Sequence, residues 1–204
     1  MLSLYYAPGA CSMAAHIVLE EGGEAYQAHR MDLAKGDQKT SAYMKIHPLG
    51  RVPALGLEDG SHLAENTAIL PFLGQRFGLW PSDGIQQAQA LSVIGFFASN
   101  VHPAFAHIRR PERYTEDVTA HPGLQKVGQH MFHSYLVQID GMYQGREWLS
   151  ERFSVLDPYA WVFYVWGRRI HLPMAELKNY TALYERMLKR PAVQRVVADE
   201  GLTL

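Results

Sequence analysis

The sequence predicts an α/β domain over residues 1–79 and an all-helical domain over residues 87–204, joined by a linker at residues 80–86. Three observations lead to this prediction. Short strand-like and helix-like segments alternate up to about residue 80, where nine of the 17 glycines lie. Trp80–Gly84 has the composition of a linker. Every apolar pattern after it has helical spacing.

The first domain begins with a strand and a helix. Leu2–Tyr6 is a short apolar run with two β-prone tyrosines, and Ala7-Pro8-Gly9 ends it. The two tyrosines point to opposite faces of the strand, so at least one should lie in the core. Apolar residues recur at helical spacing over Cys11–Glu21, and Gly22-Gly23 can stop that helix.

The rest of the first domain is a strand, a short helix, a hairpin and a longer helix: Tyr26–Asp32, Ala42–Ile46, Ala54–Leu57, His62–Ala64 and Thr67–Phe77. Asn66 is the expected N-cap of the longer helix. Pro71 lies inside that helix, where it should remove a hydrogen bond and bend the axis. The order β-α-β-α-β-β-α is that of a thioredoxin-like unit.

Five helices are predicted after the linker: Ile85–His107, Leu124–Tyr143, Tyr159–Trp166, Ala175–Lys189 and Pro191–Asp199. The first of them should kink at Pro103. Ser154 and Asp157 have the spacing of a capping box just before the third. Pro158 follows at once, where it would remove the first interior hydrogen bond of that helix.

Composition excludes several classes of protein. Apolar residues make up 48% of the 204 residues and charged residues 19%, which excludes disorder as the main state. The net charge of −1 argues against nucleic acid as a partner. No run approaches the roughly 18 apolar residues of a membrane span, and the N-terminus lacks the pattern of a signal peptide. The single cysteine can form no internal disulfide, which predicts a soluble protein of the cytoplasm.

Cys11 is the most informative residue, because it lies at the start of the first predicted helix. The helix N-terminus favours a thiolate, but it supplies at most about 2 kcal/mol. Lowering a thiol pKa by about two units needs about 2.7 kcal/mol, so a second donor or cation would have to help. The alternative is a small buried hydrophobe. Ala14 stands where a dithiol oxidoreductase has its second cysteine, so Cys11 would hydrogen-bond a foreign thiol or form a mixed disulfide with it.

Two further segments could bind a small peptide-like ligand. The Val52–Pro53 bond is a candidate cis peptide that would expose the Val52 backbone for strand-like pairing, although a trans bond is the commoner case. Glu65 and Asn66, at the start of the next helix, offer a carboxylate for an amine, and an amide with helix N–H groups for a carboxylate. Simple helix capping is the alternative for Asn66.

Taken in order, these motifs resemble those of bacterial glutathione transferases over nearly the whole chain, and the cysteine points to the beta class. The motifs are Tyr5-Tyr6-Ala7-Pro8-Gly9-Ala10-Cys11-Ser12, Val52-Pro53-Ala54-Leu55, Asp59-Gly60, Glu65-Asn66-x-Ala68-Ile69-Leu70, Phe153-Ser154-x-x-Asp157 and Arg190-Pro191-Ala192-Val193. The resemblance implies glutathione as cosubstrate, a small hydrophobic electrophile as second substrate, and a homodimer.

The resemblance also implies site residues. Cys11 and His102 would be catalytic, with Cys11 facing the glutathione sulfur and His102 near the thiol. The glutathione site would consist of Ala10, Cys11, Lys35, Arg51, Val52, Pro53, Glu65, Asn66, Ser99 and His102. The electrophile pocket would include Tyr6, Phe105 and Trp166. A core role is the alternative for Trp166, and packing between the domains is the alternative for His102.

The chain departs from the family pattern at three places. Pro103 stands where similar proteins often carry Lys, Asn66 where Ser or Gly is commoner, and Leu49 where Lys is frequent. These departures leave a glutathione site in place and bear on the choice of second substrate. Ser12 is an alternative to Cys11 as the hydrogen-bond donor to the thiol.

No metal is expected, although the chain has ten histidines. His130 and His133 lie one turn apart on a predicted helix, and His102 and His107 could form another pair. Two ligands do not make a site, and no cysteine or carboxylate completes a known spacing.

Three functions stay open from the sequence. The leading hypothesis is a transferase that adds the glutathione thiolate to an electrophile. A second is a glutathione-dependent thiol-disulfide transferase or reductase that works through a mixed disulfide at Cys11. A third, of another class, is a non-catalytic protein that binds glutathione or a hydrophobic ligand.

Overall fold

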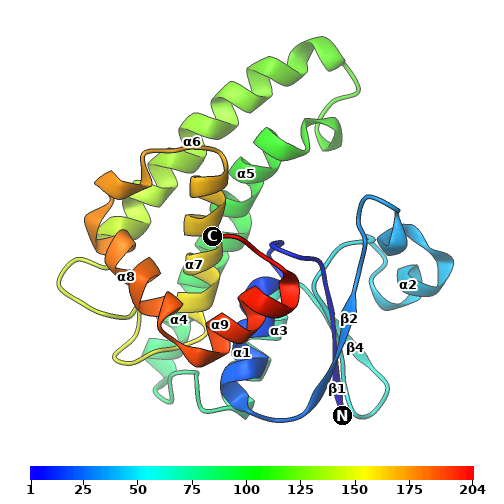
Figure 1. Cartoon of the computed structure of the whole chain (residues 1–204), viewed down its shortest axis with the longest axis vertical. Coiled ribbons are helices and arrows are strands. Elements are labelled where there is room, and N and C mark those ends of the chain that lie inside the picture. The colour runs from blue at the N-terminus through cyan, green and yellow to red at the C-terminus, as the bar shows by residue number, and fades with distance from the viewer.

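The computed structural model describes all 204 residues and confirms a thioredoxin-like domain followed by a helical one (Figure 1). The sheet of the first domain has the strand order β2-β1-β3-β4. Its strands are β1 (Leu2–Tyr6), β2 (Tyr26–Arg30), β3 (Ala54–Gly56) and β4 (His62–Ala64). β1 runs parallel to β2 and antiparallel to β3, with Leu4 opposite Ala28 and Leu55.

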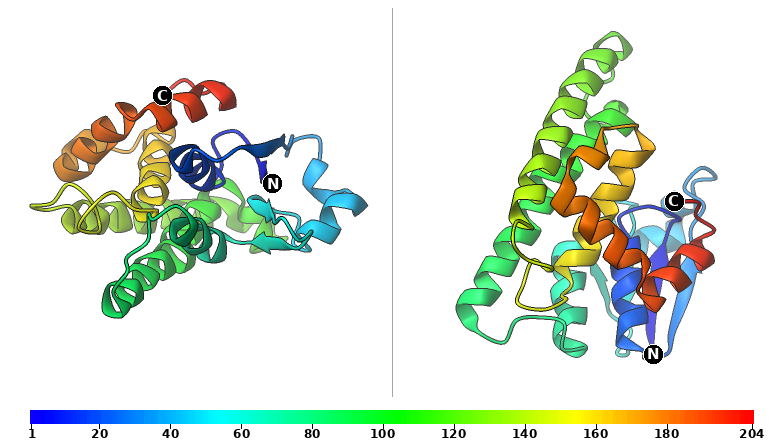
Figure 2. Two further views of the ribbon diagram at one scale, coloured as in Figure 1. Left: turned by 90° about the horizontal axis from the view of Figure 1, so that it is seen from below. Right: turned by 60° about the vertical axis from the view of Figure 1, so that its left-hand side comes forward.

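Three helices flank this sheet: α1 (Met13–Gly22), α2 (Ser41–Ile46) and α3 (Asn66–Arg76). α1 and α3 cover the face turned toward the helical domain, whereas α2 lies on the other side (Figures 1 and 2). α1 is apolar enough to be buried over Met13–Leu19, which places the start of α1, and with it the loop after β1, at the boundary between the domains.

The helical domain contains α4 (Gly84–Phe96), α5 (His102–Arg109), α6 (His121–Met142), α7 (Leu156–Arg169), α8 (Lys178–Leu188) and α9 (Pro191–Glu200). α5 and α6 lie side by side and extend beyond the other helices (Figure 2). α7 is buried on every side from Leu156 to Gly167, as expected of a helix that is apolar all round. One cluster of 43 buried residues spans both domains, so α1 shares its core with α7 and α9.

Pro103 accounts for a break in the first long helix predicted after the linker. The helix predicted over residues 85–107 is interrupted by a π-helical turn, Phe97–Val101, and α5 then carries Pro103 as its second residue. A proline cannot donate to the preceding turn, and a widened turn accommodates that loss. The kink predicted at Pro103 therefore takes the form of a π-turn directly before it.

The expected effect of Pro158 is wrong. α7 begins at Leu156 rather than at Tyr159, so Pro158 lies in its first turn, where backbone N–H groups have no partner within the helix. The contact predicted between Ser154 and Asp157 is confirmed, because the Ser154 N–H donates to Asp157 Oδ2 at 2.9 Å.

Two other details of the predicted helices are corrected. Asn66 is not the N-cap of α3 but its first residue, and the cap position belongs to Glu65. The helix predicted from Ala175 is divided into a 3-10 turn, Met174–Glu176, and α8. None of the helices combines the length and the apolar character needed to cross a membrane.

Candidate active site

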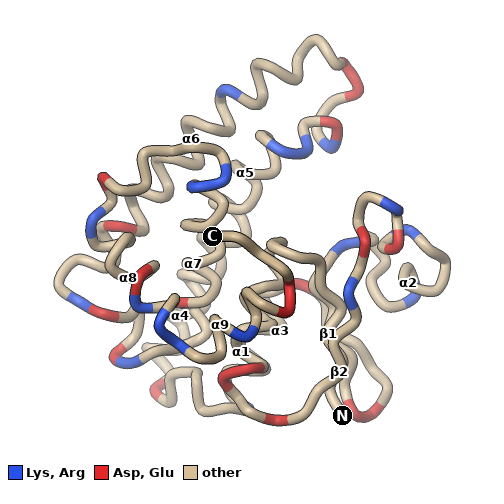
Figure 3. The backbone as a smooth tube through the Cα atoms, viewed as in Figure 1, with Lys and Arg blue, Asp and Glu red and all other residues tan.

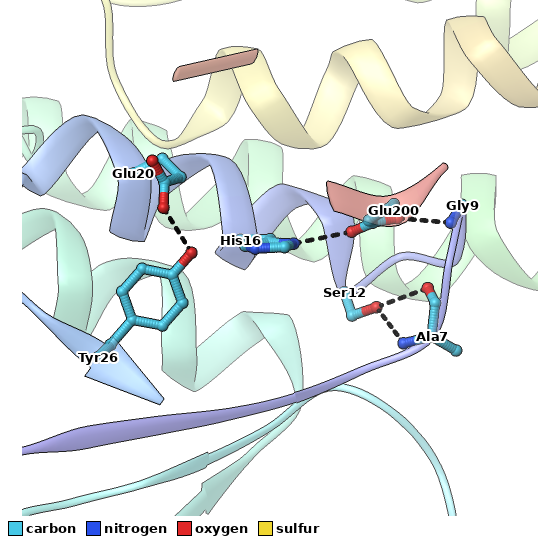
Figure 4. Close-up of polar contacts among 7 residues, drawn as sticks. All are labelled: Ala7, Gly9, Ser12, His16, Glu20, Tyr26 and Glu200. Carbon is cyan, nitrogen blue, oxygen red and sulfur yellow. Dashed lines mark hydrogen bonds and ion pairs between the residues drawn. The ribbon is translucent and has the colours of Figure 1, made fainter. Parts of the chain in front are cut away.

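The loop between β1 and α1, residues 7–12, is closed by the Ser12 hydroxyl. Ser12 Oγ accepts from the Ala7 N–H at 3.1 Å and donates to the Ala7 carbonyl at 3.3 Å (Figure 4). The Ser12 side chain is buried, and these two contacts lie within its own loop. Ser12 is thus engaged in the structure of the loop, whereas the neighbouring Cys11 points elsewhere.

Cys11 faces the backbone of the predicted cis peptide. The Val52–Pro53 bond is cis, which confirms the prediction. Cys11 Sγ donates to the Val52 carbonyl oxygen at 3.2 Å. A loop from the start of α1 and the turn before β3, 41 residues apart in sequence, therefore meet at one thiol and one carbonyl.

Burial keeps the Cys11 thiol protonated, so the help that a thiolate would need beyond the helix start is not sufficient here. Burial raises the pKa of Cys11 to about 12, and the nearby Glu65 carboxylate adds to that rise. The backbone N–H groups of Cys11 and Ser12 and the charge of Arg113 act in the opposite direction, as expected at a helix start, but they are outweighed. In this structure the protonated Cys11 thiol acts as a hydrogen-bond donor to the Val52 carbonyl.

Glu65 and Asn66 lie beside this thiol. Asn66 Nδ2 donates to the Cys11 carbonyl at 3.0 Å, and Asn66 Oδ1 is buried without a hydrogen-bond partner. Glu65 has a φ of 68°, in the region where non-glycine residues are strained. Its carboxylate is exposed and lies 3.9 Å from His47 Nε2. A free carboxylate and an orphaned amide oxygen suit a ligand that carries an ammonium group.

Aromatic side chains from α5 and α7 gather close to the same loop. The Phe105 and Trp166 rings are stacked at 4.3 Å, and the His102 ring meets Trp166 edge-on at 5.1 Å. Trp166 Nε1 donates to the Gly9 carbonyl at 3.0 Å. Three of the predicted site residues are thus in contact with one another, and one of them reaches the Cys11 loop.

His102 is neutral at physiological pH. Burial lowers its pKa to about 4, and the positive charges of Arg113 and Arg51 lower it further. Arg113 follows α5 in a short 3-10 turn, close in sequence to Arg109 and Arg110. Figure 3 shows basic positions at and just beyond the end of α5. Arg51 comes directly before Val52. The charges of both domains therefore act on this imidazole.

Replacing Arg113 with alanine is expected to raise the pKa of His102 from about 4 toward its ordinary value of 6.5, because one of the nearby positive charges is removed. Burial remains, so the recovery should be partial. NMR titration of the imidazole measures this shift. Arg195→Ala is the matched control, since Arg195 pairs with Glu20 and its loss should leave His102 unchanged. An equal pKa in Arg113→Ala and the parent chain would contradict the assignment.

The other predicted site residues are not joined to Cys11 by hydrogen bonds or ion pairs. Lys35 is exposed, and its Nζ lies 3.3 Å from Asp32 Oδ2. Ser99 is exposed and donates to the carbonyl of Gly95 in the same helix. Ala10 is half-buried in the loop. Tyr6 is a core residue whose ring lies 4.8 Å from that of His16.

The comparisons with known proteins identify the family. The model of the family described as "Glutathione S-transferase, N-terminal domain" matches residues 9–76. Glutathione S-transferase GstA of Escherichia coli O157:H7 is 31% identical over 98% of this chain and 100% of its own length. The chain belongs to the glutathione S-transferase family.

Solved structures of glutathione S-transferases share the fold over the full chain. A glutathione transferase homologue from Sulfitobacter with bound glutathione has a TM-score of 0.92 at 31% identity, covering 100% of this chain and 99% of its own. The beta-class glutathione S-transferase of Sphingomonas chungbukensis has a TM-score of 0.87 at 30% identity, covering 98% and 100%. Members of the glutathione S-transferase family are enzymes, and this chain is similar to the bacterial beta class of that family.

Sequence reasoning missed three charged residues of the helical domain that act on the candidate site, Arg113, Arg169 and Glu200. Arg113 acts on His102 and Cys11, while Arg169 and Glu200 contact Gly9 in the Cys11 loop. The sequence offered only a weak indication for these charged residues, because single charged residues on helices are usually solvated. No group of three potential metal ligands is found in the structure.

Proposed function

We propose that this chain is a glutathione transferase that adds the glutathione thiolate to a small hydrophobic electrophile. The observation that carries the proposal is the contact of the Cys11 thiol with Val52 beside cis-Pro53, next to Glu65 and Asn66. The domain over residues 1–79 would bind glutathione, and the domain over residues 87–204 would supply the electrophile pocket.

Glutathione fits this site by the chemistry of its parts. The Val52 backbone would pair with the cysteinyl backbone, which places the glutathione sulfur near Cys11. The exposed Glu65 carboxylate would receive the ammonium group of the γ-glutamyl end, with Asn66 next to it. Lys35 and Arg51, both exposed cations, would face the glycyl carboxylate, with Ala10 and Ser99 at the margins of the site.

The state of Cys11 supports conjugation rather than disulfide chemistry. A thiol with a pKa of about 12 stays protonated, so its S–H can donate to the sulfur of glutathione and stabilise the thiolate there. With a pKa of about 4, His102 stays neutral and can donate an N–H to the sulfur, while the proton that the glutathione thiol releases passes to water. The sulfur then forms its bond to the electrophilic carbon. In a substitution the leaving group departs with its bonding electron pair, and in an addition the π pair moves to the neighbouring atom, which takes up a proton. Phe105 and Trp166 would contact the electrophile, with Tyr6 in the core behind.

A homodimer is also proposed. The dimer is proposed from the resemblance to bacterial glutathione transferases. Large apolar side chains are exposed singly on α4 and α6, namely Ile85, Leu91, Val127 and Val137, and isolated residues of this kind are ordinary on a protein surface.

The proposed function is tested by turnover of glutathione with chlorodinitrobenzene, an activated aryl chloride. Cys11→Ala should lower kcat/KM about tenfold or more, because a hydrogen bond to a charged sulfur is lost. Cys11→Ser keeps a donor and should retain most of the rate. Equal rates in Cys11→Ala and the parent chain would contradict the assigned role. The intact mass after exposure to glutathione disulfide distinguishes conjugation from the alternative of thiol transfer. A reducible adduct of one glutathione would favour thiol transfer.

A further inference from the structure

Both the N–H and the carbonyl group of Gly9 form hydrogen bonds with side chains of the helical domain. The Gly9 N–H donates to Glu200 Oε2 at 2.6 Å, and the Gly9 carbonyl accepts from Trp166 Nε1 and from Arg169 Nη1, each at 3.0 Å. Figure 4 shows the Glu200 carboxylate between Gly9 and His16. These partners lie 157 to 191 residues away along the chain. Three side chains from α7 and α9 therefore meet one residue of the Cys11 loop.

Two of the three partners, Glu200 and Trp166, are themselves fixed by packing. Glu200 is 1% exposed, and its other oxygen lies 2.9 Å from His16 Nδ1 on α1. Trp166 is stacked on Phe105. A buried carboxylate that loses its donors is costly, so Glu200 can hardly leave Gly9 while the chain stays folded. The contacts to Gly9 are thus part of the interdomain packing.

Gly9 is placed to transmit this constraint to the thiol. It lies two residues before Cys11, whose exposure is 8%. Within its own domain the loop is closed by Ser12 and by the bond from Asn66 to the Cys11 carbonyl. The Ser12 bonds join the two ends of the loop, and the Ala10 N–H donates to the Ala7 carbonyl within it. The contacts to Gly9 are the side-chain bonds that reach the middle of the loop from the helical domain.

We propose that Trp166, Arg169 and Glu200 are positioning residues that hold the Cys11 loop from the helical domain. They act through Gly9 and set where the Cys11 thiol lies relative to Val52. Because Trp166 also stacks on Phe105, the wall of the electrophile pocket and the thiol loop are joined through one indole. The inference about the loop stands on the contacts alone, whereas its effect on glutathione rests on the proposed function.

The single cysteine of the chain gives a direct readout, because alkylation by iodoacetamide reports on Cys11 alone. Trp166→Phe removes the indole N–H and keeps an aromatic ring. We expect alkylation about fivefold faster and glutathione affinity, measured by calorimetry, about fivefold weaker. Glu200→Ala should make alkylation about tenfold faster or more and glutathione binding about tenfold weaker or more. Glu200→Gln keeps an acceptor for the Gly9 N–H, so its alkylation rate and its glutathione affinity should lie close to those of the parent chain.

Glu21→Gln is the matched control for loss of interdomain stability. Glu21 pairs with Arg190 at 2.6 Å and 2.8 Å but does not contact the loop, so its loss should lower the melting temperature and leave alkylation unchanged. The proposal would be overturned if Trp166→Phe and Glu200→Ala were both alkylated at the rate of the parent chain. It would also be overturned if Glu21→Gln were alkylated as fast as Glu200→Ala. If the parent chain binds no glutathione while alkylation still follows this order, the proposed function fails and the positioning role stands.

Discussion

Replacing Asp157 with alanine is expected to lower the free energy of unfolding by about 3–5 kcal/mol. The carboxylate is fully buried and accepts from the Tyr143 hydroxyl at 3.0 Å, the Leu149 N–H at 3.0 Å and the Ser154 N–H at 2.9 Å. Alanine would leave these donors without a partner in a dry site. Urea unfolding of the parent and the variant measures the difference.

Asp117→Ala is the matched control, because Asp117 makes the same kind of bond at the surface. Its carboxylate accepts from the Thr119 N–H at 2.9 Å at the start of an exposed 3-10 turn. Losing an exposed cap costs about 1 kcal/mol or less. If Asp157→Ala were no more destabilising than Asp117→Ala, burial would not be the source of the effect.

The contribution of Asp157 should also depend on pH. Burial raises its pKa to about 6 from 3.8, so the folded chain binds this proton more tightly than the unfolded chain. The stabilisation from that proton is complete below about pH 4 and is lost as the pH rises through 6. Asp157→Asn cannot titrate. The unfolding free energy of the parent relative to Asp157→Asn should therefore fall between pH 4 and pH 7, and a constant difference would contradict the raised pKa.

Signals confined to a few neighbouring residues predicted the local structure well. The contact of Ser154 with Asp157 could be read from a spacing of three, and the break near Pro103 from the missing N–H. The effect of Pro158 was misjudged because a capping box with Ser154 as N-cap makes Pro158 the fourth residue of the helix. α7 begins at Leu156, so Pro158 is its third residue, where the missing N–H costs no bond within the helix.

The errors at the site have another cause. A helix start favours a thiolate at Cys11, and the N–H groups that do so are present, but the outcome is decided by burial, which depends on side chains from both domains. Asn66 was taken as an N-cap because its amide suits that role, whereas the structure turns it toward the Cys11 carbonyl. The contact of Gly9 with Glu200 spans 191 residues, and no local pattern encodes it.

Replacing Gly9 with alanine should damage both stability and the thiol site, at a cost of about 2–4 kcal/mol. Gly9 has a φ of 64°, which alanine adopts at a cost of about 1 kcal/mol. The added Cβ would lie 2.1 Å from Arg169 Nη2, so the guanidinium would have to leave the Gly9 carbonyl. Unfolding in urea and the alkylation rate of Cys11 measure the two effects.

Gly23→Ala separates backbone strain from the lost contact. Gly23 has a φ of 70°, and a Cβ there would meet nothing within 4 Å, so this variant carries the strain alone. We expect it to lose about 1 kcal/mol and to keep the alkylation rate of the parent. A Gly9→Ala variant that resembled Gly23→Ala in both measurements would show that Arg169 adds nothing. A larger loss with faster alkylation would show that the glycine is required because the helical domain reaches the Cys11 loop at this point.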